Sequence, residues 1–196
     1  MARIEPLPRE DLAQHEDFFQ AAEQFMGFVP NSLFTMARVP GLFDAFSNLT
    51  RTVFFNDLVS PQLVQMLAFM SSAGSGCRYC QAHTAKSVGN LGVPEEKVAA
   101  LWEFETSEHF DDAERAALRL AFNAGQAPNA VTDADFDACK QHFSDDQIAA
   151  IVASISTFGY LNRWNDSMAT DLEDVPGGFA DRVLADGGWE AGKHRH

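Results

Sequence analysis

Residues 77–83 read CRYCQAH and place two cysteines and a histidine within about two helical turns. A thiol reacts as its thiolate, and two cysteines in a CxxC spacing can close a reversible disulfide once one sulfur is oxidised. On a helix, residues three apart share a face, so Cys80 aligns with both Cys77 and His83. We therefore interpret Cys77 and Cys80 as a redox dithiol, with His83 placed to accept a proton or hold a water.

Two other interpretations of this segment stay open. Buried cysteine and histidine often only fill space, so the segment could be packing. A zinc site needs about four ligands, but the chain has no second CxxC and no HxxxH, and Cys139, His109 and His142 are scattered. We therefore expect no bound metal. No Gly-rich phosphate loop occurs either, so we also expect no cofactor.

The helices around the dithiol are predicted from residues that typically start or end a helix. Ser60 and Pro61 form an N-cap and first-turn pair, and the helix that follows carries an apolar stripe that includes Leu63 and Met70. The stretch SAGSG at 72–76 then breaks this helix, and a new helix opens after Gly76 and runs to residue 89 or 90. The positive end of a helix dipole lowers a thiol pKa, so we expect both thiols of this helix to ionise below their ordinary value.

The rest of the chain predicts an all-α protein. Apolar residues recur at helical spacing over 10–25, 33–37, 42–54 and 61–71, and further helices are predicted to start at Pro94, Asp111, Thr132 and Ser144. The last three starts resemble capping boxes. The pattern from Ser144 could continue into NRWNDSM, residues 162–168.

Length and charge limit the function classes. A chain of 196 residues can form one domain, 1–196, with a core over about 25–175. Residues 176–196 form a C-terminal extension. We expect Phe179 and Trp189 to anchor it on this subunit or on a neighbour. With 28 acidic and 14 basic residues the net charge is −14, which opposes nucleic acid and anionic lipid as partners. No run of about 18 apolar residues occurs, so no membrane span is expected and we predict a cytoplasmic protein.

Polar residues in the NRWND group form a second candidate cluster. Asn162, Arg163 and Asp166 lie within about one turn at the end of an apolar helix. A buried ion pair or a contact between subunits is the favoured interpretation, and a relay or pocket role is the alternative. Trp164 could cover the active cleft.

These motifs together carry a family resemblance. The segments FVPNSLFTMARVPGLFDAF, GCRYCQAHTA and GYLNRWNDSM, within about residues 25–175, resemble the carboxymuconolactone decarboxylase superfamily in its AhpD-like branch. The resemblance implies an AhpD-like bundle of about eight helices with the CxxC at a helix N-terminus, and assembly into a homo-oligomer, a trimer or a hexamer. It also implies that Cys80 attacks a hydroperoxide, that Cys77 resolves the product, and that His83 lies near the relay histidine.

The sequence departs from the family pattern at two positions. The histidine follows the second cysteine by three residues where four are usual, which rotates the ring by about 100° around the helix. The family's relay carboxylate corresponds to Gln65, which cannot take a proton at neutral pH. No Asp or Glu occurs between Asp57 and Glu95, so a carboxylate from elsewhere, such as Asp166 or Glu23, would have to fill the gap.

The function predicted from the sequence is therefore a slow, thiol-dependent hydroperoxide reductase. Its partners would be a small-molecule hydroperoxide and a thiol or dithiol reductant. Two alternatives stay open: a lyase like the family's lactone decarboxylases, and a non-enzymatic redox-sensing oligomer.

Overall fold

The computed structural model describes residues 2–195, and these residues form an all-α fold without a strand. The fold class is as predicted, although the described chain has ten α-helices where about eight were expected. They are α1 (Glu16–Met26), α2 (Asn31–Met36), α3 (Leu42–Phe54), α4 (Pro61–Ser75), α5 (Arg78–Asn90), α6 (Glu95–Ala99), α7 (Asp112–Gly125), α8 (Asp133–Lys140), α9 (Asp145–Met168) and α10 (Asp174–Val183). Short 3₁₀ segments are η1 (Arg9–His15), η2 (Ala100–Glu103), η3 (Ala185–Gly187) and η4 (Gly192–His194). Met1 and His196, the two ends of the predicted domain, lie outside the described residues.

The predicted helix starts are set by local hydrogen bonds. The Ser60 hydroxyl accepts a hydrogen bond from the Leu63 N–H at 3.2 Å, which caps α4 as expected. Helices α7, α8 and α9 each begin at a reciprocal capping box, formed by the pairs Asp111/Glu114, Thr132/Asp135 and Ser144/Gln147. The predicted continuation of α9 through NRWNDSM is also confirmed, since the helix ends at Met168.

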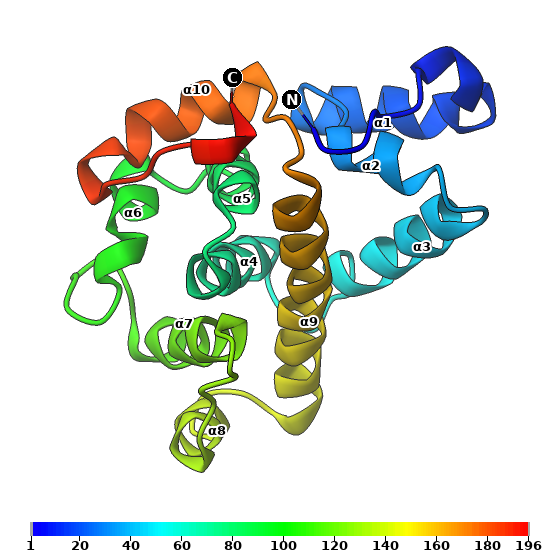
Figure 1. Ribbon diagram of the computed structural model, residues 1–196. Helices are drawn as coiled ribbons and strands as arrows, with labels where there is room; N and C mark the ends of the chain where they lie inside the picture. The colour runs from blue at the N-terminus through cyan, green and yellow to red at the C-terminus, as the bar shows by residue number, and fades with distance from the viewer. Residues whose placement is uncertain (1, 196) are drawn as a thin grey trace.

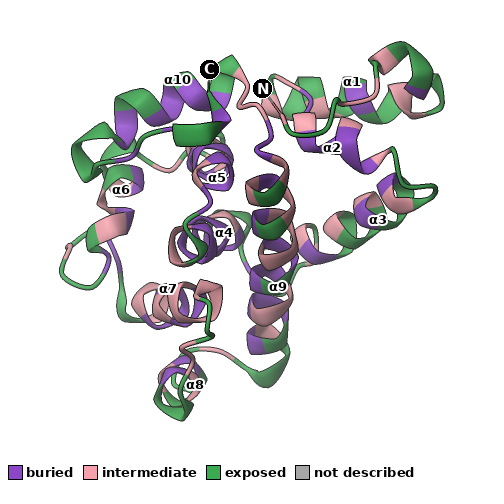
Figure 2. Cartoon of the chain, viewed as in Figure 1, coloured by how far each residue is buried: buried purple, intermediate pink, exposed green. Residues whose placement is uncertain are grey.

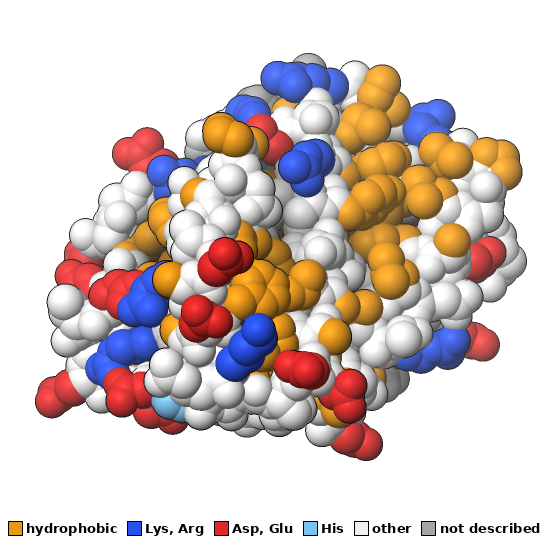
Figure 3. Space-filling model, turned by 90° about the horizontal axis from the view of Figure 1, so that it is seen from below, with side chains coloured by type: hydrophobic (Ala, Val, Ile, Leu, Met, Phe, Trp, Pro, Cys, Tyr) orange, Lys and Arg blue, Asp and Glu red, His pale blue; other side chains and the backbone are white. Residues whose placement is uncertain are grey.

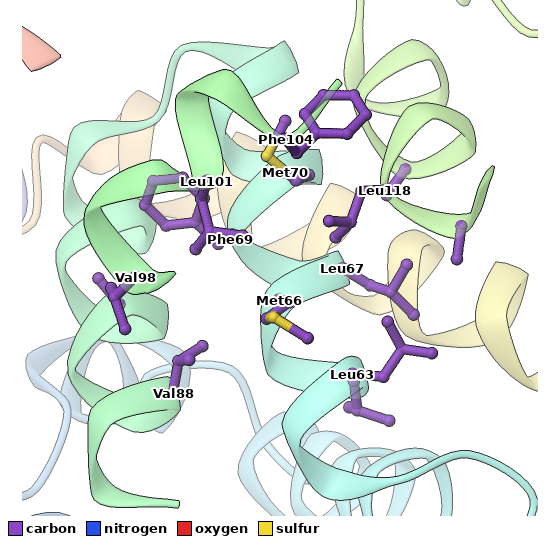
Figure 4. Packing of buried hydrophobic residues seen from close by; sticks show 14 of the residues in the cluster. Leu63, Met66, Leu67, Phe69, Met70, Val88, Val98, Leu101, Phe104 and Leu118 are labelled. Atoms are coloured by element: carbon purple, nitrogen blue, oxygen red, sulfur yellow. The ribbon is translucent and has the colours of Figure 1, made fainter. Parts of the chain in front are cut away.

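Helix α4 is the central element of the bundle. It packs against α5, α7 and α9, which surround it in Figure 1. Leu67 and Phe69 of α4 are fully buried, and Figure 4 shows them among side chains that point inward from neighbouring helices, including Val88 and Leu118. Burying each such side chain stabilises the fold by about 2 kcal/mol. Figure 2 shows that burial extends from α4 to α5, so the dithiol helix packs on the buried centre of the bundle.

The N-terminal helices form a second apolar cluster. Its buried members come from η1 to α3 and include Phe19, Met36 and Phe43, and it packs against Tyr160 and Trp164 near the end of α9. Helix α9 is therefore shared between this cluster and the central bundle, as its position in Figure 1 shows. Side chains on its different faces reach quite different surroundings.

The C-terminal extension packs on its own chain. Its predicted anchors Phe179 and Trp189 are 6% and 3% exposed. The segment contains most of a helix, α10, that the Gly-rich sequence did not predict, and this helix packs against α5. After α10 the chain returns toward the N-terminal end of α5, where the Trp189 indole N–H donates to the Arg78 carbonyl at 3.3 Å. The tail and α5 lie close together in Figure 1.

The surface carries both charged and apolar regions. Figure 3 shows apolar side chains gathered on the face seen from below, and Phe25 and Phe55 are 57% and 71% exposed. Within residues 2–195, no helix combines the length and the hydropathy that crossing a membrane requires. The single domain and the homo-oligomer stay predictions.

Candidate active site

The two cysteines lie where α4 ends and α5 begins. Gly76 ends α4 in the left-handed conformation, with φ of 77°, which glycine adopts without strain. Cys77 is then the N-cap of α5, with an extended backbone, and Cys80 is one turn into the helix. This placement confirms the predicted CxxC at a helix N-terminus.

Both thiols are free and buried. Cys77 and Cys80 are 0% and 2% exposed, and they belong to an apolar cluster with Ala68, Tyr79 and Phe158. Burial raises the pKa of the Cys80 thiol well above its ordinary value, and the neighbouring Cys77 thiol raises it further. For Cys80 the predicted lowering of the pKa is therefore wrong, because desolvation outweighs the field of the helix terminus.

One polar group acts directly on the Cys80 sulfur. The Asn165 amide Nδ2 of α9 donates to Cys80 Sγ at 3.5 Å, and the Thr170 hydroxyl fixes this amide by donating to Asn165 Oδ1 at 2.9 Å. A donor aimed at the sulfur stabilises its thiolate, so Asn165 opposes the upward shift of the Cys80 pKa.

His83 faces a carboxylate that the sequence analysis did not identify. Its Nε2 lies 2.6 Å from Glu173 Oε2, and the Tyr79 hydroxyl donates to Glu173 Oε1 at 2.9 Å. The backbone N–H of Asn31 donates to the same oxygen. Burial pushes the pKa of the Glu173 carboxyl upward, but His83 and the Asn31 N–H outweigh it, so this pKa lies below its ordinary value.

The His83 ring is held by packing as well. Tyr79 stacks on it with ring centroids 4.1 Å apart, and Phe28 meets it edge-on. Within the described residues, no hydrogen bond joins His83 to either thiol. His83 is thus one helical turn from Cys80 but is bound to Glu173, consistent with the rotation expected from its spacing.

A second imidazole lies near Cys77. His194 of η4, Asp166 of α9 and Cys77 place a ring nitrogen, a carboxylate oxygen and Sγ within 4.8 Å of one another. His194 Nδ1 bonds to the Thr170 carbonyl oxygen at 2.8 Å, and Nε2 lies 3.8 Å from Asp166 Oδ1. Burial lowers the pKa of His194 below its ordinary value.

The remaining predicted site residues are dispersed. Gln65 is half-buried in α4, and its side chain makes no hydrogen bond to any residue between 2 and 195. Asn162 is 2% exposed, and both of its amide atoms lack a partner among the described residues. Arg163 is exposed and donates to the Gly159 carbonyl at 3.2 Å. Trp164 donates to the Thr35 hydroxyl at 3.0 Å, so it packs on the N-terminal cluster.

The carboxylates proposed to replace the family's relay group fall in two places. Asp166 lies near Cys77, whereas Glu23 of α1 pairs with Arg9 of η1 at 2.6 Å. Cys139 is buried in the main core cluster, and burial raises its pKa to about 11. Glu173 is the N-cap of α10, just before the extension, and His194 lies in the extension. Neither has a spacing relation to the CxxC that the sequence alone would reveal.

Comparisons with known proteins identify the family of this chain. Residues 40–123 match the carboxymuconolactone decarboxylase family. Two solved structures of the debrominase Bmp8 are similar along nearly the whole chain. One is a cysteine-to-alanine variant in complex with 2,3,4-tribromopyrrole, with 33% identity over 93% of this chain and 100% of that chain and a TM-score of 0.88. The other is the apo form, with 35% identity over 91% and 96% and a TM-score of 0.85.

A further similar structure is the alkylhydroperoxidase AhpD core of an uncharacterized peroxidase-related protein from Ralstonia eutropha. It shares 25% identity over 91% of this chain and 95% of that chain, with a TM-score of 0.74. A search of curated proteins finds no match. The family match, the helical fold and the identity along more than nine-tenths of the chain show that this protein belongs to the carboxymuconolactone decarboxylase superfamily, in its AhpD-like branch.

Proposed function

We propose that this protein is a dithiol-dependent two-electron reductase that removes bromine from a brominated heteroaromatic ring. The observation that carries the proposal is a buried CxxC dithiol in a chain that is 33% identical to a debrominase along that protein's full length. Replacing ring bromine by hydrogen is a two-electron reduction. A dithiol supplies both electrons and both protons when it becomes a disulfide.

The proposed steps balance within the site. The ring carbon that bears bromine takes one thiol proton, and the Cys80 sulfur takes the bromine, so the electron pair of the C–Br bond returns to the ring. Cys77 then attacks the Cys80 sulfur, which closes the disulfide and releases bromide, and the second proton leaves with it. An external thiol reopens the disulfide. We assign the attack on bromine to Cys80 because the Asn165 amide donates to its sulfur and so stabilises its thiolate.

The surroundings of the sulfurs suit an apolar ring. Beside the buried cluster lie Phe54, Leu161 and Leu172, which are partly buried and pack against it. A flat aromatic ligand can stack on such side chains. Because both sulfurs are buried, the ring has to enter through a local opening of this covering layer.

A hydroperoxide is the second candidate substrate, favoured by the CxxC and the 25% identical peroxidase-related protein. Cleavage of the O–O bond would leave a sulfenic acid on Cys80, and Cys77 would displace water from it to form the disulfide. The leaving alkoxide needs a proton, but the donor that contacts Cys80 is a neutral amide. Lack of a positioned acid costs on the order of 100-fold in rate, so this reaction would be slow.

The test is rapid mixing of the reduced protein with 2,3,4-tribromopyrrole, followed by bromide release and intact mass. We expect one bromide per chain and the loss of two hydrogens. Cys77→Ser should release one bromide and stop at a sulfenic acid after water replaces the bromine on sulfur. Cys80→Ser should release none, and Cys139→Ser should behave as the unaltered protein.

Three results would contradict parts of this proposal. Bromide release from Cys80→Ser would overturn the assignment of the attacking sulfur. Rapid disulfide formation with cumene hydroperoxide, but none with the bromopyrrole, would favour the peroxidase. A disulfide that forms only with oxidised glutathione would favour the redox-sensing oligomer.

A further inference from the structure

The cluster of Cys77, Asp166 and His194 joins three metal-ligand types from distant parts of the chain. Sγ comes from the N-cap of α5, the carboxylate from the end of α9 and the imidazole from the C-terminal tail. All three atoms lie within 4.8 Å of one another. In a tetrahedral zinc site, ligand atoms are about 3.5 Å apart, so movements of about 1 Å would bring these three into coordination.

The His194 ring points a free nitrogen into this cluster. The residue is 1% exposed, and its Nδ1 is bonded to the Thr170 carbonyl, which accepts and therefore requires the ring proton on Nδ1. Nε2 then carries a lone pair, and it has no hydrogen-bond partner among residues 2–195. A buried nitrogen without a partner is costly, so its retention needs an explanation.

This arrangement of His194 is typical of a metal ligand. Histidines that bind metals usually donate the other ring N–H to a carbonyl or carboxylate, which fixes the tautomer and the orientation of the ring. Here the Thr170 carbonyl has that role. Thr170 also bonds to Asn165, so the same short segment orients a group at each sulfur.

Asp166 keeps one oxygen available for an ion. Its Oδ2 pairs with Lys193 Nζ at 2.7 Å, while its Oδ1 faces His194 Nε2 at 3.8 Å. The Lys193 ammonium weakens the carboxylate as a ligand but orients it. With one sulfur, one nitrogen and one oxygen, the ligand set selects a zinc-class transition metal over magnesium or calcium, which prefer oxygen ligands only.

We propose that Cys77, Asp166 and His194 bind a zinc-class metal ion, with a fourth position left for water or another ligand. A metal on Cys77 occupies the sulfur lone pair that closes the disulfide with Cys80. The bound ion therefore holds the dithiol in its reduced, inactive form. This consequence for turnover rests on the proposed reductase function, whereas the binding site does not.

The test uses Co²⁺ as a spectroscopic probe of the reduced, full-length protein. We expect one ion per chain, with a thiolate-to-cobalt charge-transfer band and the intense d–d bands of a tetrahedral site, and displacement by Zn²⁺. His194→Gln and Asp166→Asn should each weaken binding at least tenfold, and Cys77→Ser should abolish the charge-transfer band. His142→Gln, at an exposed histidine, and Cys139→Ser are matched controls that should bind as the unaltered protein does.

The ion should also protect one thiol. Saturating Zn²⁺ should slow alkylation of Cys77 by iodoacetamide at least tenfold, as read by peptide mass, and His194→Gln should remove the protection. Unchanged Co²⁺ binding in both His194→Gln and Asp166→Asn would overturn the proposal and place the metal on the CxxC alone. Absence of the charge-transfer band in the unaltered protein would also overturn it. These readouts require no turnover. They therefore test the metal site independently of bromide release, which tests the proposed reductase function.

Discussion

At the residue scale, the Glu173 carboxylate is the polar link between α5, α10 and the N-terminal helices. It bonds to His83, to the Tyr79 hydroxyl and to the Asn31 N–H, and its side chain is 11% exposed. Removing the charge of a buried carboxylate weakens the hydrogen bonds that its donors make to it. We expect Glu173→Gln, which keeps the shape but not the charge, to lower the unfolding free energy at pH 7 by about 2 kcal/mol. Urea denaturation measures this difference.

The pKa of Glu173 gives that difference a pH dependence. Because its folded-state pKa is lowered, the carboxylate contributes stability above its unfolded value of about 4.3, and that stability is lost as pH falls through the lower folded value. The difference between the unaltered protein and Glu173→Gln should therefore shrink as pH falls below about 4.3 and disappear below the folded pKa of Glu173. Glu190→Gln, at an exposed position, is the matched control and should leave stability unchanged. A difference that persists undiminished at low pH would refute the role of the charge.

At the element scale, the platform under the dithiol depends on the close approach of α4 and α7. A Cβ on Gly74 would lie 2.3 Å from the Phe122 carbonyl oxygen, and one on Gly125 would lie 2.3 Å from the Ser71 carbonyl oxygen. Backbone atoms cannot move aside as a flexible side chain can. We expect Gly74→Ala to lower the unfolding free energy by about 2 kcal/mol, and its thermal midpoint by about 4–8 °C.

Gly178 provides the matched control for this substitution. It also lies inside a helix, but it is exposed, and no atom would lie within 4 Å of an added Cβ. Gly178→Ala should raise the unfolding free energy by about 0.5–1 kcal/mol, because alanine loses less backbone entropy in a helix. Calorimetry on both variants compares the two effects directly. Equal shifts of the same sign would show that helix propensity, and not interhelical distance, controls this pair.

The same scale separates what the sequence predicts from what it does not. Helix starts such as those at Ser60 and Ser144 depend on residues three positions apart, so they can be predicted from local spacing. The CxxC at a helix N-terminus depends on Gly76 in the same way. Glu173 and His194 reach the site through contacts between residues far apart in the chain, and α10 contains Pro176 and two glycines, which ordinarily disfavour a helix. The carboxylate that contacts His83 and the imidazole near Cys77 could therefore not be identified from local patterns.

At the scale of the whole molecule, net charge is the dominant electrostatic property. The chain has 28 acidic and 14 basic residues, and its exposed ion pairs, such as Arg119–Glu105 and Arg182–Glu95, use only part of the acidic excess. Like charges confined to a compact shape repel one another, and unfolding relieves this repulsion. Salt screens it over a Debye length of about 30 Å at 0.01 M and about 8 Å at 0.15 M.

We therefore expect the thermal midpoint to rise by about 2–4 °C, equivalent to about 1 kcal/mol, when NaCl is raised from 0.01 M to 0.15 M at pH 7. Scanning calorimetry at constant protein concentration measures the change. At about pH 5, where carboxylates begin to take up protons, the same salt step should have a smaller effect. A midpoint that falls with salt at pH 7 would mean that screened ion pairs outweigh the net repulsion. The ion pairs would then contribute more to the salt dependence of stability than the repulsion that arises from the net charge of −14.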